Sequence, residues 1–69
     1  MDGAGKAYRA AIEANPKDAG AHFNLGLLLE NERQDVDGAE QAYRAAVAAD
    51  PGYAWAHNNL HNLMSRRES

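Results

Sequence analysis

The sequence predicts an all-α fold of about four helices, built from two copies of one helix-turn-helix unit. The first observation is internal repetition, since residues 2–34 and residues 37–69 share 16 identities in 33 aligned pairs at an offset of 35. The second is that apolar residues recur with a helical period in four segments. The third is that no segment alternates apolar and polar residues as a half-buried strand does. These observations together favour paired helices over any arrangement with a sheet.

The first predicted helix covers residues 3–14, and its repeat equivalent covers residues 38–49. Apolar residues occur in both at spacings i, i+3, i+4, i+7 and i+8, which places them on one side of a helix. They are Ala4, Ala7, Tyr8, Ala11 and Ile12 in the first segment, and Ala39, Ala42, Tyr43, Ala46 and Val47 in the other. Asp37, followed three residues later by Glu40, matches a capping box and is expected to cap the second of these helices.

The other two predicted helices cover residues 19–31 and 54–66, and each follows a proline. Proline lacks a backbone N–H and restricts the residue before it, so Pro16 and Pro51 are expected in the turns between helices. The helical spacing again selects one apolar side. Its residues are Ala21, Leu25, Leu28 and Leu29 in the first of the two, and Ala56, Leu60, Leu63 and Met64 in the second.

The segment from residue 19 to residue 51 contains three motifs in this order: His22-x2-Leu25-Gly26-x2-Leu29, then Ala39-x3-Tyr43, and finally Pro51. Their order and spacing are similar to the pattern W-x2-L-G-x2-Y, A-x3-F, P of the tetratricopeptide repeat, which the chain resembles over essentially its whole length. The resemblance implies an α-solenoid of stacked helix pairs that acts as a scaffold for protein partners. It also implies one domain over residues 1–69. We expect a partial repeat at 2–18, a complete repeat at 19–51 and a partial repeat at 54–69.

The sequence departs from the family pattern at three histidines. His22 and His57 stand in the place of the tryptophan, and His61 stands where Gly26 lies in the complete repeat. Because glycine lets a neighbouring helix approach closely, the last helix is expected to pack less closely than the second.

Composition excludes several classes of protein. The chain contains no cysteine, so disulfides and thiolate metal sites are ruled out. A net charge of −3 argues against binding to nucleic acid, which usually requires a basic face. No apolar run reaches the ~18 residues of a membrane helix, and no signal peptide is visible at the start. We therefore expect a cytoplasmic protein without nucleic-acid or membrane partners.

Neither an enzyme nor a metal site is expected. His57 and His61 lie on one side of a helix at i and i+4, but Asn58 replaces the glutamate that a zincin motif requires. The serines are Ser65 and Ser69, and no base accompanies them as in a nucleophile–base pair. We predict no catalytic residue, no metal and no cofactor.

The resemblance implies that the first helix of each repeat lines a concave surface on which an extended peptide binds. Asn24 and Asn59 are equivalent in the repeat, and asparagine in this place clamps a peptide backbone in family members. A carboxamide suits this role because it both donates and accepts hydrogen bonds. Further candidates expected on the same surface, outside the apolar core stripe, are Phe23, Leu27, Trp55, Asn58 and Asn62. The same faces also carry Gly20, Glu30, Asn31 and Arg66. The first functional hypothesis is a non-catalytic scaffold that binds a protein or peptide.

The alternative hypothesis is self-assembly. The partial repeats leave apolar residues without a neighbouring helix, and further copies of the chain would cover them by head-to-tail stacking or by helix exchange. The candidate residues are Ala4 and Tyr8 at one end, and Leu60, Leu63 and Met64 at the other. This hypothesis predicts a homo-oligomer.

Overall fold

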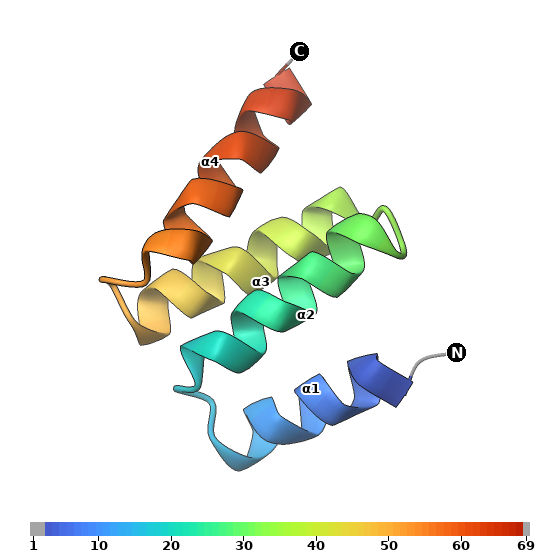
Figure 1. The fold of residues 1–69 in the computed structure, drawn as a ribbon, viewed down its shortest axis with the longest axis vertical. Coiled ribbons are helices and arrows are strands. Elements are labelled where there is room, and N and C mark those ends of the chain that lie inside the picture. Colours follow the sequence, from blue (N-terminus) through green and yellow to red (C-terminus); the bar gives the residue numbers. More distant parts are fainter. Residues whose placement is uncertain (1–2, 69) are drawn as a thin grey trace.

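A computed structural model describes the backbone of residues 3–68 and the side chains of residues 6–66. Four helices follow one another in space as they do in sequence (Figure 1). They are α1 (Gly3–Ala14), α2 (Ala19–Asn31), α3 (Val36–Ala49) and α4 (Ala54–Glu68). Each helix packs on the next one, and the stack measures 36 × 30 × 14 Å. The prediction of an all-α fold of stacked helix pairs is confirmed.

The predicted boundaries agree with the structure for α1 and α2, whereas α4 ends two residues later than predicted and the expected cap of α3 was wrong. The N-cap is Asp35, whose Oδ1 accepts a hydrogen bond from the backbone N–H of Gly38 at 2.9 Å. Asp37 therefore lies in the first turn of the helix and does not precede it. The backbone N–H of Asp35 also donates to the carbonyl oxygen of Leu29 at 2.8 Å. This bond ties the start of α3 to the end of α2, which explains why the helix begins two residues earlier than predicted.

The two proline turns are built alike. The Asn15 Oδ1 accepts from the backbone N–H of Lys17 at 3.2 Å, and the Asp50 Oδ1 accepts from that of Gly52 at 3.1 Å. In both cases a short polar side chain binds the backbone two residues ahead, which stabilises a tight turn. The structure thus repeats the turn chemistry at the same offset as the sequence.

The histidines in the tryptophan place join each turn to the helix that follows it. The Nε2 of His22 lies 2.8 Å from the carbonyl oxygen of Pro16, and the Nε2 of His57 lies 2.7 Å from that of Pro51. Since a carbonyl oxygen only accepts, Nε2 is the donor in both bonds. These side chains hold the turns by hydrogen bonding, in a place where the family pattern has an indole.

The tightest packing in the protein is between α2 and α3. The ring of Tyr43 is fully buried and lies against the backbone at Gly26. A Cβ atom at this position would lie 2.6 Å from Cδ1 of Tyr43 and closer still to Cε1. Small residues on α3 complete the close approach. The buried cluster consists of Phe23, Leu29, Ala39, Ala42, Tyr43, Ala46, Ala56 and Leu63.

Phe23 belongs to this cluster, and its expected place on the exposed surface was wrong. Its side chain is 9% exposed, and its ring centroid lies 5.9 Å from Tyr43, 5.4 Å from Tyr53 and 6.2 Å from Trp55. The turn after α3 brings Tyr53 and Trp55 over Phe23. This covers a residue that helical periodicity alone places outside the core stripe.

The three residues of α4 that were expected to be uncovered differ in how far they are exposed. Leu63 is completely buried, and Leu60 is half-buried against the core, because α4 packs on α3 with this side. The expectation of an exposed Leu63 was therefore wrong. Met64 is 36% exposed. At the other end Tyr8 is half-buried, and the Ala4 side chain lies outside the described residues.

The Gly26–Tyr43 contact predicts opposite effects for one chemical change at two glycines of α2. Gly26→Ala should lower the free energy of unfolding by about 1–3 kcal/mol, because the new methyl group overlaps the Tyr43 ring. At Gly20 a Cβ would lie 3.4 Å from Oδ1 of Asp18, which is an ordinary contact. Gly20→Ala should therefore be neutral, or stabilising by up to about 1 kcal/mol. Urea unfolding followed by circular dichroism measures both, and equal effects would contradict the packing described for Gly26.

Candidate peptide-binding groove

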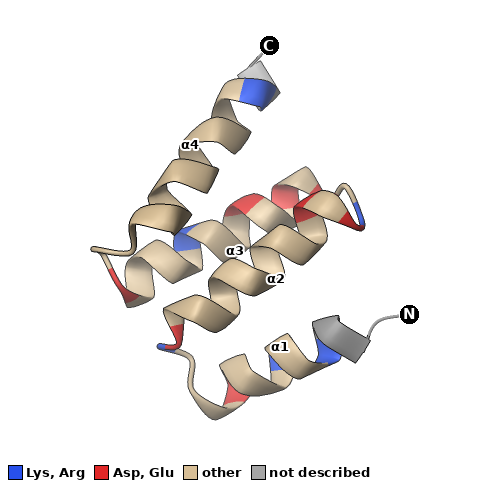
Figure 2. Ribbon diagram, viewed as in Figure 1, with Lys and Arg blue, Asp and Glu red and all other residues tan. Residues whose placement is uncertain are grey.

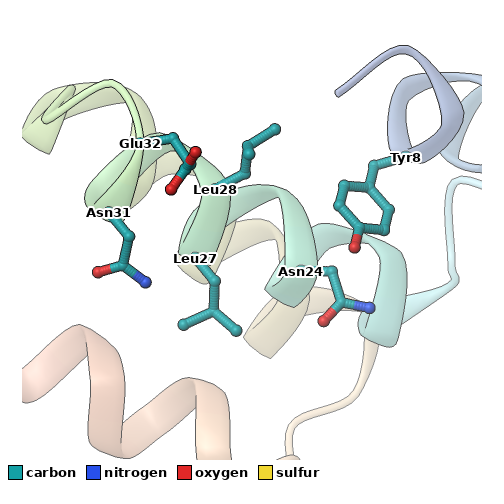
Figure 3. Close-up of a pocket in the computed structure, with 6 residues that line it drawn as sticks. All are labelled: Tyr8, Asn24, Leu27, Leu28, Asn31 and Glu32. Carbon is teal, nitrogen blue, oxygen red and sulfur yellow. The ribbon is translucent and has the colours of Figure 1, made fainter. Parts of the chain in front are cut away.

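The first helices of the two repeats, α2 and α4, present equivalent strips of side chains. On α2 the strip contains Asn24, Leu27 and Asn31, and Figure 3 shows that these project from the same side of the helix. Their spacing of three and four residues explains this, since such positions are neighbours on a helix surface. The equivalent residues of α4 are Asn59, Asn62 and Arg66.

A hollow of about 210 Å³ lies between α1 and α2 along this strip. Tyr8 from α1 forms one wall, and the residues of α2 and of the turn that follows form the other (Figure 3). The lining residues are Tyr8, Asn24, Leu27, Leu28, Asn31 and Glu32. Asn24 is exposed, and no described residue forms a hydrogen bond with its amide group. The hollow therefore offers an available carboxamide beside apolar side chains.

A second hollow of about 400 Å³ adjoins the first. It is lined by Glu30, Asn31, Gln34, Val36 and Arg66. Asn31 borders both hollows, so the open surface continues from α1, along the C-terminal half of α2, to the end of α4. We call this continuous surface the groove.

A polar cluster lies where the groove meets the core. The hydroxyl of Tyr43 donates to Oε1 of Glu30 at 2.8 Å, and Nη2 of Arg66 donates to Oε2 of the same carboxylate at 2.5 Å. Burial and the neighbouring Glu30 carboxylate raise the pKa of Tyr43 to about 12, while a hydrogen bond from Asn59 and the charge of Arg66 act in the opposite direction. The cluster joins α2, α3 and α4 through one shared carboxylate.

Charged side chains are absent from most of the two groove helices. Figure 2 shows α2 without charge between Asp18 and Glu30, and α4 is likewise uncharged until Arg66 within the described side chains. The charges near the groove gather at its far end, around the turn between α2 and α3. The surface along α2 consequently offers hydrogen-bonding and apolar groups more than charge.

The structure brings only part of the predicted site together. Asn24 and Leu27 line the first hollow, whereas Trp55, Asn58 and Asn62 lie exposed on α4 outside it. Trp55 is 66% exposed and its ring stacks at the edge of the aromatic cluster around Phe23.

Asn59 differs from its repeat equivalent Asn24. Asn59 is half-buried, and its amide group binds the hydroxyl of Tyr43, so it already has a partner inside the protein. Glu30 accompanies this pair on α2, whereas the described residues place no carboxylate beside Tyr8 in the same way. The two asparagines thus occupy equivalent positions with different surroundings.

The sequence predicted Asn31 on this face but did not predict Leu28 or Glu32 there, and Tyr8 was assigned to self-association. The repeat itself contained a signal for Tyr8. Tyr8 and Asn24 are the equivalents of Tyr43 and Asn59, which are in contact, so their proximity in the first hollow follows from the offset.

The described residues contain neither a metal-binding group nor a membrane-spanning helix. No three of their His, Asp or Glu side chains form a group that could hold a metal ion. His57 uses its Nε2 for the Pro51 carbonyl, as described above. None of the described helices has the length and apolar character needed to cross a membrane.

Stacked helix pairs that present a groove on their first helices define a helical-repeat scaffold. The model of the tetratricopeptide repeat family matches residues 2–54, and the chain belongs to this family. Tetratricopeptide repeats generally mediate protein–protein interaction, and the family is typically a non-catalytic scaffold. Neither curated proteins nor solved structures include a significant match to the chain.

The polar cluster predicts a specific loss of stability at alkaline pH. The pKa of Tyr43 is raised from 10.0 to about 12, so the folded protein holds this proton more tightly than the unfolded chain does. The resulting stability is complete below pH 10 and is lost as the pH rises from 10 to about 12. The urea midpoint of the wild type should therefore fall more steeply over this interval than that of Tyr43→Phe. Tyr8→Phe is the matched control, because it leaves the cluster intact and should keep the wild-type slope. Parallel curves for wild type and Tyr43→Phe would contradict the assignment.

Proposed function

We propose that the chain is a non-catalytic scaffold that binds an extended peptide of a protein partner in the groove. The observation that carries this proposal is the Asn24 amide group, which is exposed in a hollow and has no hydrogen-bond partner among the described residues. Such a carboxamide can accept from a peptide N–H and donate to a peptide carbonyl. This mode of binding reads the backbone of the partner and tolerates different side chains.

The spacing along α2 supports an extended ligand. Asn24 and Asn31 are seven residues apart, which is about 10.5 Å along a helix. An extended peptide advances about 3.3 Å per residue, so three of its residues cover nearly the same distance. The two carboxamides therefore match peptide units three residues apart. Leu27 lies between them on the same side of α2 and provides apolar contact for an intervening side chain (Figure 3).

The lack of charge along α2 supports a ligand without a required charge at its centre. A peptide carboxylate or a phosphate group would need basic residues, and the described groove contains Arg66, which is already paired with Glu30. Apolar or uncharged polar segments are the ligands that fit this surface best.

Self-association through the end helices stays an untested prediction, and the surfaces at these ends do not favour it. Met64 is the clearly exposed member of its expected contacts within the described side chains, while Tyr8 and Leu60 are half-buried and Leu63 is buried. Tyr8 also lines the groove and is thereby available to a peptide.

Peptide binding is tested with random linear peptides displayed on phage, selected on the wild-type protein and then titrated by fluorescence anisotropy. Asn24→Ala should weaken binding of a selected peptide about fivefold, because one hydrogen bond contributes about 1 kcal/mol. It should not change the melting temperature, since the amide group has no partner among the described residues. Asn59→Ala should lower the melting temperature, because its amide binds the Tyr43 hydroxyl.

Asn58→Ala is the matched control for this experiment, since it removes an exposed carboxamide outside the hollow. It should leave both affinity and melting temperature unchanged. If the selected peptides bind wild type and Asn24→Ala equally, the groove is not their site.

A further inference from the structure

The contact between α2 and α3 defines what the next helix of the array requires. The Tyr43 ring fills the space above Gly26, and a Cβ atom there would overlap the ring. The Tyr43 hydroxyl also needs the Glu30 carboxylate, to which it donates at 2.8 Å. The packing of α3 on α2 therefore uses two residues of α2: Gly26, which leaves space for the tyrosine ring, and Glu30, which accepts a hydrogen bond from the tyrosine hydroxyl.

The repeat offset of 35 residues shows which residues would form the equivalent contact between two copies of this chain. α4 is the equivalent of α2, and α1 is the equivalent of α3, with Tyr8 in the place of Tyr43. If α1 of a second copy packed on α4 as α3 packs on α2, its Tyr8 ring would lie on residue 61. Residue 61 is His61, whose Cβ would occupy the space that the Tyr8 ring needs.

Other substitutions on α4 act in the same direction. Position 65 holds Ser65 in place of Glu30, so the carboxylate that accepts from the tyrosine hydroxyl has no equivalent. Asn58 replaces Phe23 and is exposed, as are His61 and Asn62. The outer face of α4 is consequently polar at positions where α2 is apolar.

We propose that His61 is the specificity-determining residue that closes the outer face of α4 to α1 of a second copy. Half-buried Leu60 and exposed Met64 leave some apolar surface on this face. Overlap between the His61 side chain and the Tyr8 ring of the second copy prevents α1 from covering Leu60 and Met64 in the way that α3 covers α2. The chain therefore does not extend into head-to-tail stacks with the geometry of the α2–α3 pair, and His61→Gly opens the face to this one occupant.

Sedimentation equilibrium from micromolar to millimolar concentration tests the proposal. The wild type should stay at 7.5 kDa. His61→Gly should show a mass that rises with concentration, because the Tyr8 ring then has the space that Gly26 provides in α2. His61→Ala should stay monomeric like the wild type, since the obstruction begins at Cβ. His61→Gly combined with Tyr8→Ala should also stay monomeric, because the ring that fills the space is gone.

Glycine inside α4 lowers helix stability, so the variants are also made in a Gly20→Ala background, and circular dichroism checks that each is folded. Association of the wild type equal to that of His61→Gly overturns the proposal. The same holds if His61→Ala associates as strongly as His61→Gly, or if folded His61→Gly remains at the monomer mass. None of these outcomes depends on whether the groove binds a peptide.

Discussion

The contact of the Tyr43 ring with the backbone at Gly26 sets how closely α2 and α3 approach each other. At this distance the Tyr43 hydroxyl reaches Glu30 on α2, and the same carboxylate receives Arg66 from α4. The ring of Tyr43 also packs against Phe23, which in turn contacts Tyr53 in the turn after α3. Three helices are therefore positioned around one residue. The groove lies along the outer side of this assembly, so its shape depends on a contact that the ligand would not touch.

The two copies of the repeat unit share the hydrogen bonds of their turns, but the equivalent asparagines have different neighbours. Both turns use a polar side chain before the proline and a histidine in the next helix to bind the proline carbonyl. These bonds direct α2 and α4 in the same way, so Asn24 and Asn59 reach equivalent positions. Their neighbours are not equivalent, since Asn59 meets a tyrosine that is also bound to Glu30, whereas Asn24 faces an open hollow. One asparagine has become part of the structure, and the other is available to a partner.

Helical periodicity and the repeat offset predicted the four helices, the turns and the family, because these depend on residues close together in sequence. The errors concern contacts between segments. Phe23 lies outside the apolar stripe of its helix, and the rings packed around it, those of Tyr43, Tyr53 and Trp55, come from later segments of the chain. Leu63 was expected to lack a neighbour, but α4 turns this side toward α3. The α3 cap was assigned to the later of two aspartates, and the bond from Asp35 to the end of α2 decides for the earlier one. For the groove, the sequence placed Asn24, Leu27 and Asn31 on one face, but not Leu28 and Glu32, which join the lining of the first hollow only in the folded chain.

The helices of this protein contact their neighbours in sequence, and α1 has no buried side chain within the described part of the chain. A helix with few buried contacts opens locally at a lower free energy than a pair of helices with a buried contact between them. The first hollow has Tyr8 of α1 as one wall, so a molecule that bridges α1 and α2 must hold this helix in its docked position. Part of the binding free energy would then be used to hold α1 on α2. The affinity would depend on the fraction of molecules in which α1 is already packed on α2. A residue on the far side of α1 could thus change affinity without touching the ligand.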